Sequence, residues 1–467
     1  MIATAADHTA RAALGRHVLA IQDTTEINFS GHEGSKRGFG VVGNGKDIGF
    51  FLHPVLVTEA GSGPSDVGHC GGIVGLADAF VRTRAKAPPG GRKSREAQRK
   101  KGRPIAMRES GRWLDGLRAA ERTLAGAAMV TVVADCESDI YDLFAAPRAG
   151  HVHLLVRAEH DRCLEGGTKL FAEMAASPPV AGWWITVPAK PGRAERSARV
   201  AASFKRIEIK RPHYGHINKS RPKTIALTAI RVAEVDPPEG APPIAWVLLT
   251  THAVANAQDV ARIVRWYRAR WTIEQVFRSI KTQGFDLERS QIETPQAMAK
   301  LAIGVLIAAV RTMQLVHARS GATGQKLTDA LEQAAAPLVE ALTRKLEGKT
   351  ARLKNPHPPD TLARLAWVVG RLGGWDGRGG RSVCPPHPFS TDHNHASARW
   401  FPAGPLPQRG GIGRRGPVLA LHRRRLPAAA GSRRCAPGAA SPGRRHRGRR
   451  LPPRPADLRV NHRTGCP

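Results

Sequence analysis

The chain has 467 residues, a formal net charge of +34 and a sequence pI near 11.2. This length allows two or three domains with a sizeable core, and the charge is far larger than solubility requires. Such a balance favours a nucleic-acid partner over an anionic membrane surface. Six cysteines occur without a CxxC motif or a Cys/His pairing at zinc-finger spacing. This pattern argues against a structural zinc site and indicates a reducing cytoplasm.

No targeting or membrane segment is predicted. The first twenty residues lack the apolar region of a signal peptide, and no stretch reaches about 18 uninterrupted apolar residues. The run "LAIGVLIAAV" at 301–310 is apolar but only half that length, so we expect a buried helix there. The sequence therefore predicts no membrane partner.

Strand-like and helical runs alternate through the first third of the chain. Because Val, Ile and other apolar residues gather in them, residues 18–29, 49–57 and 71–83 are predicted strands. "GFGVVGNGKDIG" at 38–49 lacks a GxGxxG in the right order after a strand, which argues against a Rossmann enzyme. The next predicted elements are a basic loop at 84–106, a helix at 109–126, a buried strand ending at Asp135 and a helix capped near Ser138.

Residues 150–250 are rich in short β-branched runs, and helical periodicity returns from 257 to about 345. The pattern predicts an α/β fold with a β-rich insertion before its last functional helix. We divide the chain into the first part of the α/β domain at 1–149, the β-rich insertion at 150–256, helices at 257–345, a residual helical region at 346–377 and a tail at 378–467.

The tail has a different composition. From Arg378 onward there are 19 arginines, no lysine and only two acidic residues, so half of the net charge lies in the last fifth of the chain. It has almost no hydrophobic periodicity, and we predict that it is disordered. One interpretation is a basic arm for nucleic acid, and the other is translation of GC-rich DNA in a shifted frame.

Three carboxylates stand out by position: Asp23 and Asp135 each end a strand-like run, and Glu274 lies on a cationic helix. Such acids can hold two divalent cations about 3.5–4 Å apart for phosphoryl transfer. We expect the three side chains to converge, with Asp139 as the alternative if Asp135 points away. A glycosidase would also use paired acids, but it gives no reason for the +34 charge.

The segment "WYRARWTIEQVFRSIKT" at 266–282 is predicted to be a helix with one polycationic stripe. At about 100° per residue, four residues fall within roughly 40° of Glu274, while Ile273, Val276 and Ile280 point the other way. Such a stripe is suited to bind a polyanion through its cations, while the carboxylate in the middle of the stripe binds a metal ion. The four stripe residues besides Glu274 are Tyr267, Arg270, Arg278 and Lys281.

The spacing Tyr267-x2-Arg270-x3-Glu274-x6-Lys281 resembles the Y-R-E-K signature of the DDE transposases of bacterial insertion sequence family 4. "IQDTT" around Asp23 resembles the first-aspartate motif of that family. "VVADCESDIYDLF" resembles the second, with Cys136 in place of the usual arginine. "AWVLLTT", whose Trp246 precedes Tyr267 by 21 residues, resembles the end of the family's β insertion. The similarity runs from about residue 15 to 375.

The resemblance implies an RNase H-like mixed sheet flanked by helices, in which Asp23, Asp135 and Glu274 bind two Mg²⁺ or Mn²⁺ ions. It implies metal-dependent cleavage and strand transfer at the double-stranded ends of a mobile element, with target DNA as the second substrate, a homodimer on DNA and a place at the nucleoid. Phosphate contacts are implied for Tyr267, Arg270 and Lys281, and a base-stacking role for Trp246. Two further neighbours of the DNA end are expected, Trp271 and Arg278.

A non-catalytic DNA-binding regulator of an intact transposase is the alternative. Only 22 residues precede Asp23, fewer than a DNA-recognition region needs, and the tail offers little apolar periodicity for a dimer surface. We therefore expect an impaired transposase with strong, salt-sensitive and sequence-blind DNA binding.

Overall fold

The computed structural model describes residues 1–31, 36–43, 45–61, 71–84, 108–187, 194–213 and 220–375. The chain divides into two units, Met1–Leu406 and Pro407–Pro467, and every described residue belongs to the first. The predicted basic loop at 84–106, apart from Arg84, and the predicted disordered tail at 378–467 lie outside the described residues.

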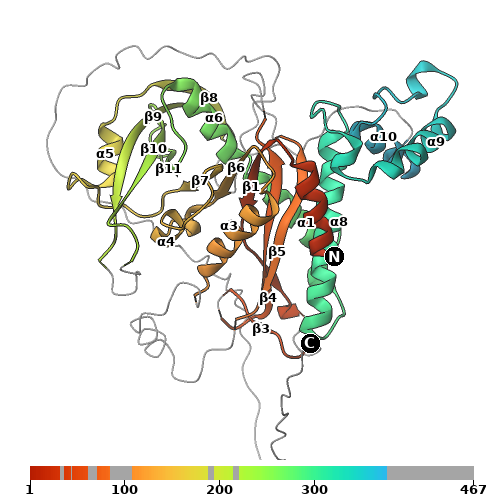
Figure 1. Ribbon diagram of the computed structural model, residues 1–467, viewed down its shortest axis with the longest axis horizontal. Coiled ribbons are helices and arrows are strands. Elements are labelled where there is room, and N and C mark those ends of the chain that lie inside the picture. The colour runs from red at the N-terminus through yellow and green to blue at the C-terminus, as the bar shows by residue number, and fades with distance from the viewer. Residues whose placement is uncertain are drawn as a thin grey trace, which may run out of the picture. The chain divides into compact units, whose positions relative to one another are not determined.

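One mixed sheet of 11 strands organises the first unit (Figure 1). Its order is β2-β4-β1-β6-β7-β11-β10-β9-β8, and β3 and β5 each pair with β4 beside this path. The strands are β1 (His17–Gln22), β2 (Thr25–Asn28), β3 (Gly40–Val41), β4 (Ile48–Glu59), β5 (Ile73–Arg82), β6 (Met129–Ala134), β7 (Val152–Arg157), β8 (Ala181–Val187), β9 (Arg196–Lys210), β10 (Thr224–Glu234) and β11 (Ala245–Thr250).

The middle of the sheet is parallel. β1 pairs in parallel with β6, and β6 with β7, whereas the other described pairings are antiparallel. These three strands are almost continuously apolar, as expected for strands buried on both faces. Because they run the same way, their carboxyl ends meet at one edge of the sheet.

Helices cover both faces of the sheet, and α1, α3 and α8 all contact β5 (Figure 1). The helices are α1 (Ile2–Ala12), α3 (Gly111–Thr123), α4 (Tyr141–Phe144), α5 (Leu170–Ala176), α6 (Ala257–Arg268), α7 (Trp271–Lys281), α8 (Pro295–Ala318), α9 (Ala336–Leu346) and α10 (Leu362–Leu372). Short 3₁₀ helices include η3 (Cys136–Ser138), η4 (Leu287–Arg289), η5 (Leu327–Asp329), η6 (Gln333–Ala335) and η7 (Ala351–Leu353).

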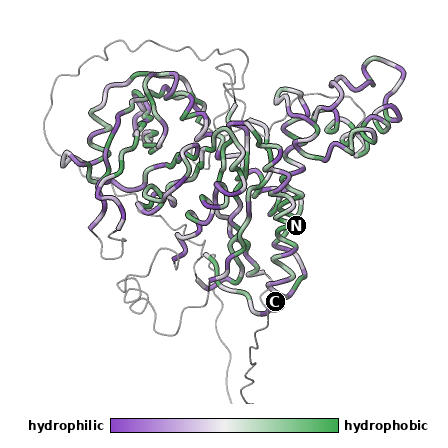
Figure 2. The backbone as a smooth tube through the Cα atoms, in the orientation of Figure 1, coloured by the Kyte–Doolittle hydropathy of each residue, from purple (hydrophilic) through white to green (hydrophobic). Residues whose placement is uncertain are grey.

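Alternation along β1 divides the core into two clusters. Leu19 and Ile21 pack in the cluster formed with α6, α7 and α8, whereas Val18 and Ala20 pack with α3 and α4. Successive side chains of a strand point to opposite faces, so one buried strand serves both layers. Figure 2 shows hydrophobic stretches along the central strands and α8. The predicted mixed sheet flanked by helices is confirmed.

α8 is the one helix of the described residues that could cross a membrane by length and composition alone. It packs against β5, α7 and α10, and Ala302, Leu306 and Met298 are completely buried. These contacts are those of a core helix, as the apolar run at 301–310 predicted.

Three local expectations need correction or addition. α1 was not predicted. The predicted helix is α4, whose N-cap is Ile140 without a side-chain hydrogen bond, so the predicted cap near Ser138 is wrong. The side chain of Asp135 caps the short η3 instead, where it accepts a hydrogen bond from the Glu137 N–H. The strands within 150–256 continue the central sheet, since β7 pairs with both β6 and β11.

Candidate active site

Two aspartates leave the parallel strands at matched positions. Ile21 of β1 pairs with Val133 of β6, and Asp23 and Asp135 each follow two residues later, close enough to interact electrostatically. Neighbouring strands lie about 4.8 Å apart, and side chains two residues apart share a face. Both aspartates therefore follow apolar residues of the cluster that contains α6 and α7. The sheet register brings together acids that are 112 positions apart in the sequence.

The residues on either side of Asp23 are fixed on the opposite face of β1. His53, completely buried in β4, has one ring nitrogen 2.8 Å from the Thr24 hydroxyl and the other 3.2 Å from the Gln22 side-chain oxygen. Burial lowers the pKa of His53 to about 3, so the ring is neutral and one nitrogen accepts a hydrogen bond. With Gln22 and Thr24 held there, Asp23 is directed toward α7.

Asp139 has a structural position and is not an alternative ligand. Its side chain is fully buried and accepts hydrogen bonds from the backbone N–H groups of Glu159 and His160, at 2.8 and 2.9 Å. Arg162 donates to it at 3.0 Å through Nε. A carboxylate satisfied in this way anchors the loop after β7, so Asp135 alone of the two faces the site.

The predicted helix at 266–282 is two helices. α6 ends at Arg268 and α7 begins at Trp271, and the joint at Ala269–Arg270 contains neither glycine nor proline. Backbone bonds of the i→i−3 type, from Arg270 to Tyr267 at 3.1 Å and from Thr272 to Ala269 at 3.0 Å, tighten the chain there. The single-helix prediction is therefore wrong, although Ile273, Val276 and Ile280 are buried as predicted.

Arg270, at this joint, connects two of the three predicted acids. Its Nη1 donates to Asp23 Oδ2 and its Nη2 to Glu274 Oε1, both at 2.9 Å. The side chains of Arg270, Asp23 and Glu274 are 11%, 16% and 29% exposed. Arg270 was expected on an exposed stripe; instead it is a buried cation between two carboxylates.

Burial raises the pKa of every acid in the site, and the charge of a neighbouring acid adds to each rise. The pKa of Asp23 rises to about 7, first through desolvation and then through the charge of Asp135, and Arg270 opposes both. Desolvation is also the largest cause of the raised pKa of Asp135 and of Glu274. Asp135 interacts electrostatically with both of the other acids. Arg270 hydrogen-bonds to two of these acids, whereas Arg278 and Arg112 act on Glu274 and Asp135 through charge alone.

Aromatic side chains lie next to the cluster formed by Arg270, Asp23 and Glu274. Tyr267 is buried, which raises the pKa of its phenol to about 12, and its ring centroid lies 5.7 Å from that of Trp246 on β11. Trp271 lies beside Arg270, with 5.4 Å from the guanidinium carbon to the ring centroid. The structure therefore brings Trp246, Tyr267 and Trp271 to the predicted site.

The remaining cations of the predicted stripe lie further along α7. Arg278 is exposed and interacts electrostatically with Glu274. Lys281 forms an ion pair with Glu288 of η4, with 3.3 Å between Nζ and Oε1. The same Glu288 oxygen accepts the backbone N–H of Asn28 at 3.0 Å, so it joins η4 to β2. Lys281 is not a free cation.

Arg157 is a site residue that the sequence did not single out. Leu155 of β7 pairs with Val133, so Arg157 continues the row formed by Asp23 and Asp135 on the third parallel strand. It is exposed and interacts electrostatically with Tyr267 and Cys136. A signal was present, because an arginine ends a strand-like run directly after the apolar residues "LLV" at 154–156.

The donor chemistry of the three acids fits a hard divalent cation. Mg²⁺ and Mn²⁺ prefer carboxylate oxygens, and the site offers three partly buried carboxyl groups, two of which hydrogen-bond to Arg270. Their present arrangement is not a coordination shell, since the described residues contain no group of three His, Cys, Asp or Glu side chains positioned to hold a metal. Arg270 occupies one oxygen of Asp23 and one of Glu274 instead.

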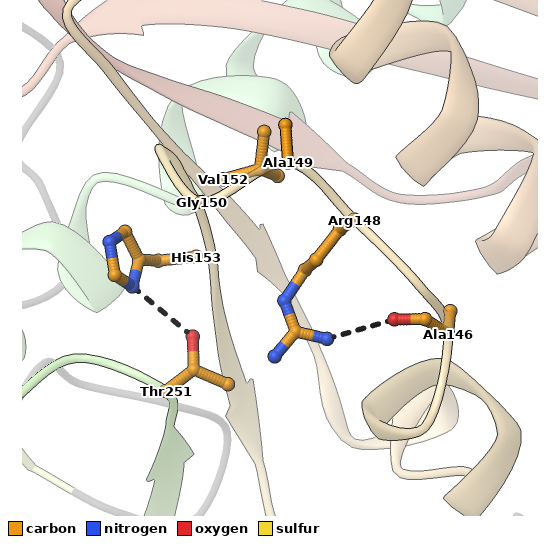
Figure 3. A pocket seen from close by; sticks show the side chains of 7 residues that line it. All are labelled: Ala146, Arg148, Ala149, Gly150, Val152, His153 and Thr251. Atoms are coloured by element: carbon orange, nitrogen blue, oxygen red, sulfur yellow. Dashed lines mark hydrogen bonds between the residues drawn. The ribbon is translucent and has the colours of Figure 1, made fainter. Parts of the chain in front are cut away.

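A separate hollow lies at the opposite end of the parallel strands. It is lined by Arg148, His153 and Thr251 together with small residues of the loop before β7 (Figure 3). Arg148 donates to the Ala146 carbonyl at 3.1 Å, and the His153 ring is 3.4 Å from the Thr251 hydroxyl. None of the predicted site residues lines this hollow.

One comparison with known proteins bears on this geometry. Residues 85–311 match the sequence model of a family described as "Transposase DDE domain". The matched segment contains Asp135, Arg270 and Glu274, and Asp23 lies before it. With two acids of the site inside the match and the third adjacent in the sheet, the family match supports a DDE transposase.

Proposed function

We propose that this chain is a DDE transposase of the insertion sequence family 4 type with an RNase H-like fold. It cleaves DNA strands at the ends of a mobile element, and the freed 3′-OH then attacks a phosphodiester of another strand, which joins the two strands as the old phosphate–oxygen bond breaks. The observation that carries the proposal is the register of β1 and β6, which aligns Asp23 with Asp135, together with the Arg270 link from Asp23 to Glu274.

Asp23, Asp135 and Glu274 would hold two Mg²⁺ or Mn²⁺ ions. When bound, such ions supply an activated water and stabilisation of the leaving oxygen. The protein's own contribution is positioning. β1 and β6 present two carboxylates on one edge, and burial of the site under α6 and α7 strengthens each charge interaction there.

The basic and aromatic residues around the acids would hold the DNA end. Arg157, Arg278 and Lys281 provide positive charge for phosphates, which fixes the position of the duplex without reading its sequence. Trp246 lies against Tyr267 and offers a ring for a displaced base.

Nicking of supercoiled plasmid DNA in Mg²⁺ or Mn²⁺ tests this function. Glu274→Gln keeps an oxygen that can accept from Arg270 but removes the charge, so nicking should fall below detection. Binding to a random-sequence duplex should be unchanged or slightly stronger, because a negative charge beside DNA is lost.

The matched control is Glu332→Gln, a surface acid paired with Arg11, which should nick at the wild-type rate. Equal nicking by Glu274→Gln and wild type would refute the mechanism. Metal-independent binding without any nicking by the wild type would support a non-catalytic DNA-binding regulator instead.

A further inference from the structure

Arg270 competes for the oxygens that a metal ion would need. Asp23 Oδ2 accepts from Arg270, and Asp23 Oδ1 accepts the backbone N–H of Thr24 at 2.7 Å, so neither oxygen is free of a hydrogen bond. Glu274 gives Oε1 to the same guanidinium. A divalent cation entering this arrangement meets a positive charge already placed between two of its three ligands.

The Arg270 guanidinium has a further donor group that could bind a phosphate. Arg270 Nε is buried and has no hydrogen-bond partner in the described structure. A buried donor without a partner is costly, and phosphate accepts two parallel hydrogen bonds from one arginine. The two carboxylates bind Nη1 and Nη2 and leave the Nε–H group without a partner. A phosphate could accept a hydrogen bond from that group.

The backbone beneath Arg270 is suited to a small movement. Arg270 is the first residue before α7, in the tightened joint that follows α6. A 3₁₀-type interruption of a helical segment is a common place for a hinge. Tyr267 and Ile273, on either side, are held in the core, so a movement at the joint changes mainly the direction of the Arg270 side chain.

From these contacts we propose that Arg270 couples DNA binding to metal binding. In the DNA-free protein it neutralises Asp23 and Glu274 and keeps the metal affinity low; a DNA phosphate that takes over the guanidinium releases both carboxylates for metal. The inference rests on the proposed function, from which its two ligands, DNA and a divalent metal ion, are taken. By reciprocity, metal should raise the affinity for DNA by the same factor by which DNA raises the affinity for metal.

The first test measures Mn²⁺ binding to the full chain without DNA, by electron paramagnetic resonance of free Mn²⁺. Arg270→Gln removes the charge that competes with the metal, so its Mn²⁺ affinity should exceed that of the wild type by about tenfold or more. Adding Asp23→Asn to this variant should abolish the gain. A folded Arg270→Gln with wild-type or weaker Mn²⁺ affinity would overturn the proposal.

Arg278→Gln is the matched control, because it removes a cation from the same helix that influences Glu274 only at a distance. It should change Mn²⁺ affinity less than about threefold. An equal gain in both variants would mean that general charge, and not the Arg270 contacts, sets the affinity. Arg270→Lys keeps the charge but lacks the planar fork, and it should lie between wild type and Arg270→Gln. Thermal melts with and without Mn²⁺ establish that each variant is folded.

The second test adds a random-sequence duplex. DNA should raise the Mn²⁺ affinity of the wild type and raise that of Arg270→Gln much less, and equal gains would overturn the coupling. These readouts are independent of nicking. If the wild type never nicks DNA but Arg270→Gln gains Mn²⁺ affinity that depends on Asp23, the coupling is supported and the proposed function fails. If the wild type nicks DNA but Arg270→Gln shows no change in Mn²⁺ affinity, the proposed function is supported and the coupling fails.

Discussion

Asp23→Asn should stabilise the DNA-free, metal-free protein while destroying its activity. Folding raises the pKa of Asp23 from 3.8 to about 7, mainly because the carboxylate is desolvated and lies near Asp135. The folded chain therefore binds a proton at this site more tightly than the unfolded chain does. Stability from this group is fully present below pH 4 and is lost as the pH rises toward 7.

The size of the effect follows from the shift. About three pKa units at 1.36 kcal/mol each give about 4 kcal/mol as an upper value above pH 7. Asp23 is 16% exposed and the asparagine can still accept from Arg270, so we expect a gain of roughly 1 to 4 kcal/mol at pH 8. The gain should shrink toward zero near pH 4, where the wild-type carboxyl is also protonated.

Urea denaturation in EDTA between pH 4 and 8 measures this difference. Asp259→Asn is a suitable control, since this acid lies at the start of α6 and pairs with Arg262 near the surface. It should be slightly destabilising at a helix N-terminus. An Asp23→Asn protein that is less stable than wild type at pH 8, or equally stabilised at pH 4 and pH 8, would refute the reasoning.

Two predictions concern the cations. Arg157→Ala should weaken DNA binding at every sequence and lower the slope of log affinity against log salt by about one, because one phosphate contact is lost; an unchanged slope in filter binding would remove Arg157 from the interface. Lys281→Ala should weaken DNA binding in the same way. Glu288→Gln keeps an acceptor for the Asn28 N–H but no longer forms the ion pair with Lys281, so it should strengthen DNA binding. Weaker DNA binding by a folded Glu288→Gln protein would contradict this.

The sheet was largely predictable because its strands are local. β1, β4, β5 and β6 are runs of β-branched and aliphatic residues, and the two aspartates follow such runs directly. Register was not predictable, because the match of Ile21 to Val133 depends on packing between segments more than a hundred residues apart. Local pattern therefore identified the acids, and only the sheet shows that they are adjacent.

The surroundings of Glu274 were less predictable for a different reason. Helical spacing places Arg270 and Glu274 on one stripe, but it does not say which partner a charged side chain meets. Ala and Arg are good helix formers, so nothing local indicated the joint at Ala269–Arg270. The burial of Arg270 follows from Asp23, a residue 247 positions away.

The paired state of the cations changes how DNA recognition at this site should be understood. A surface of free lysines and arginines binds any polyanion, because each contact only exchanges water and salt for phosphate. At this site Arg270 already binds two carboxylates and Lys281 already binds Glu288. A phosphate must replace those partners, which costs free energy unless the displaced carboxylates gain a metal ion or solvent in return. Loosely placed DNA can meet exposed Arg157 and Arg278 without that exchange. We therefore expect DNA binding and DNA cleavage to depend on different cations. Arg270 should contact phosphate only in the complex that also contains the metal ion.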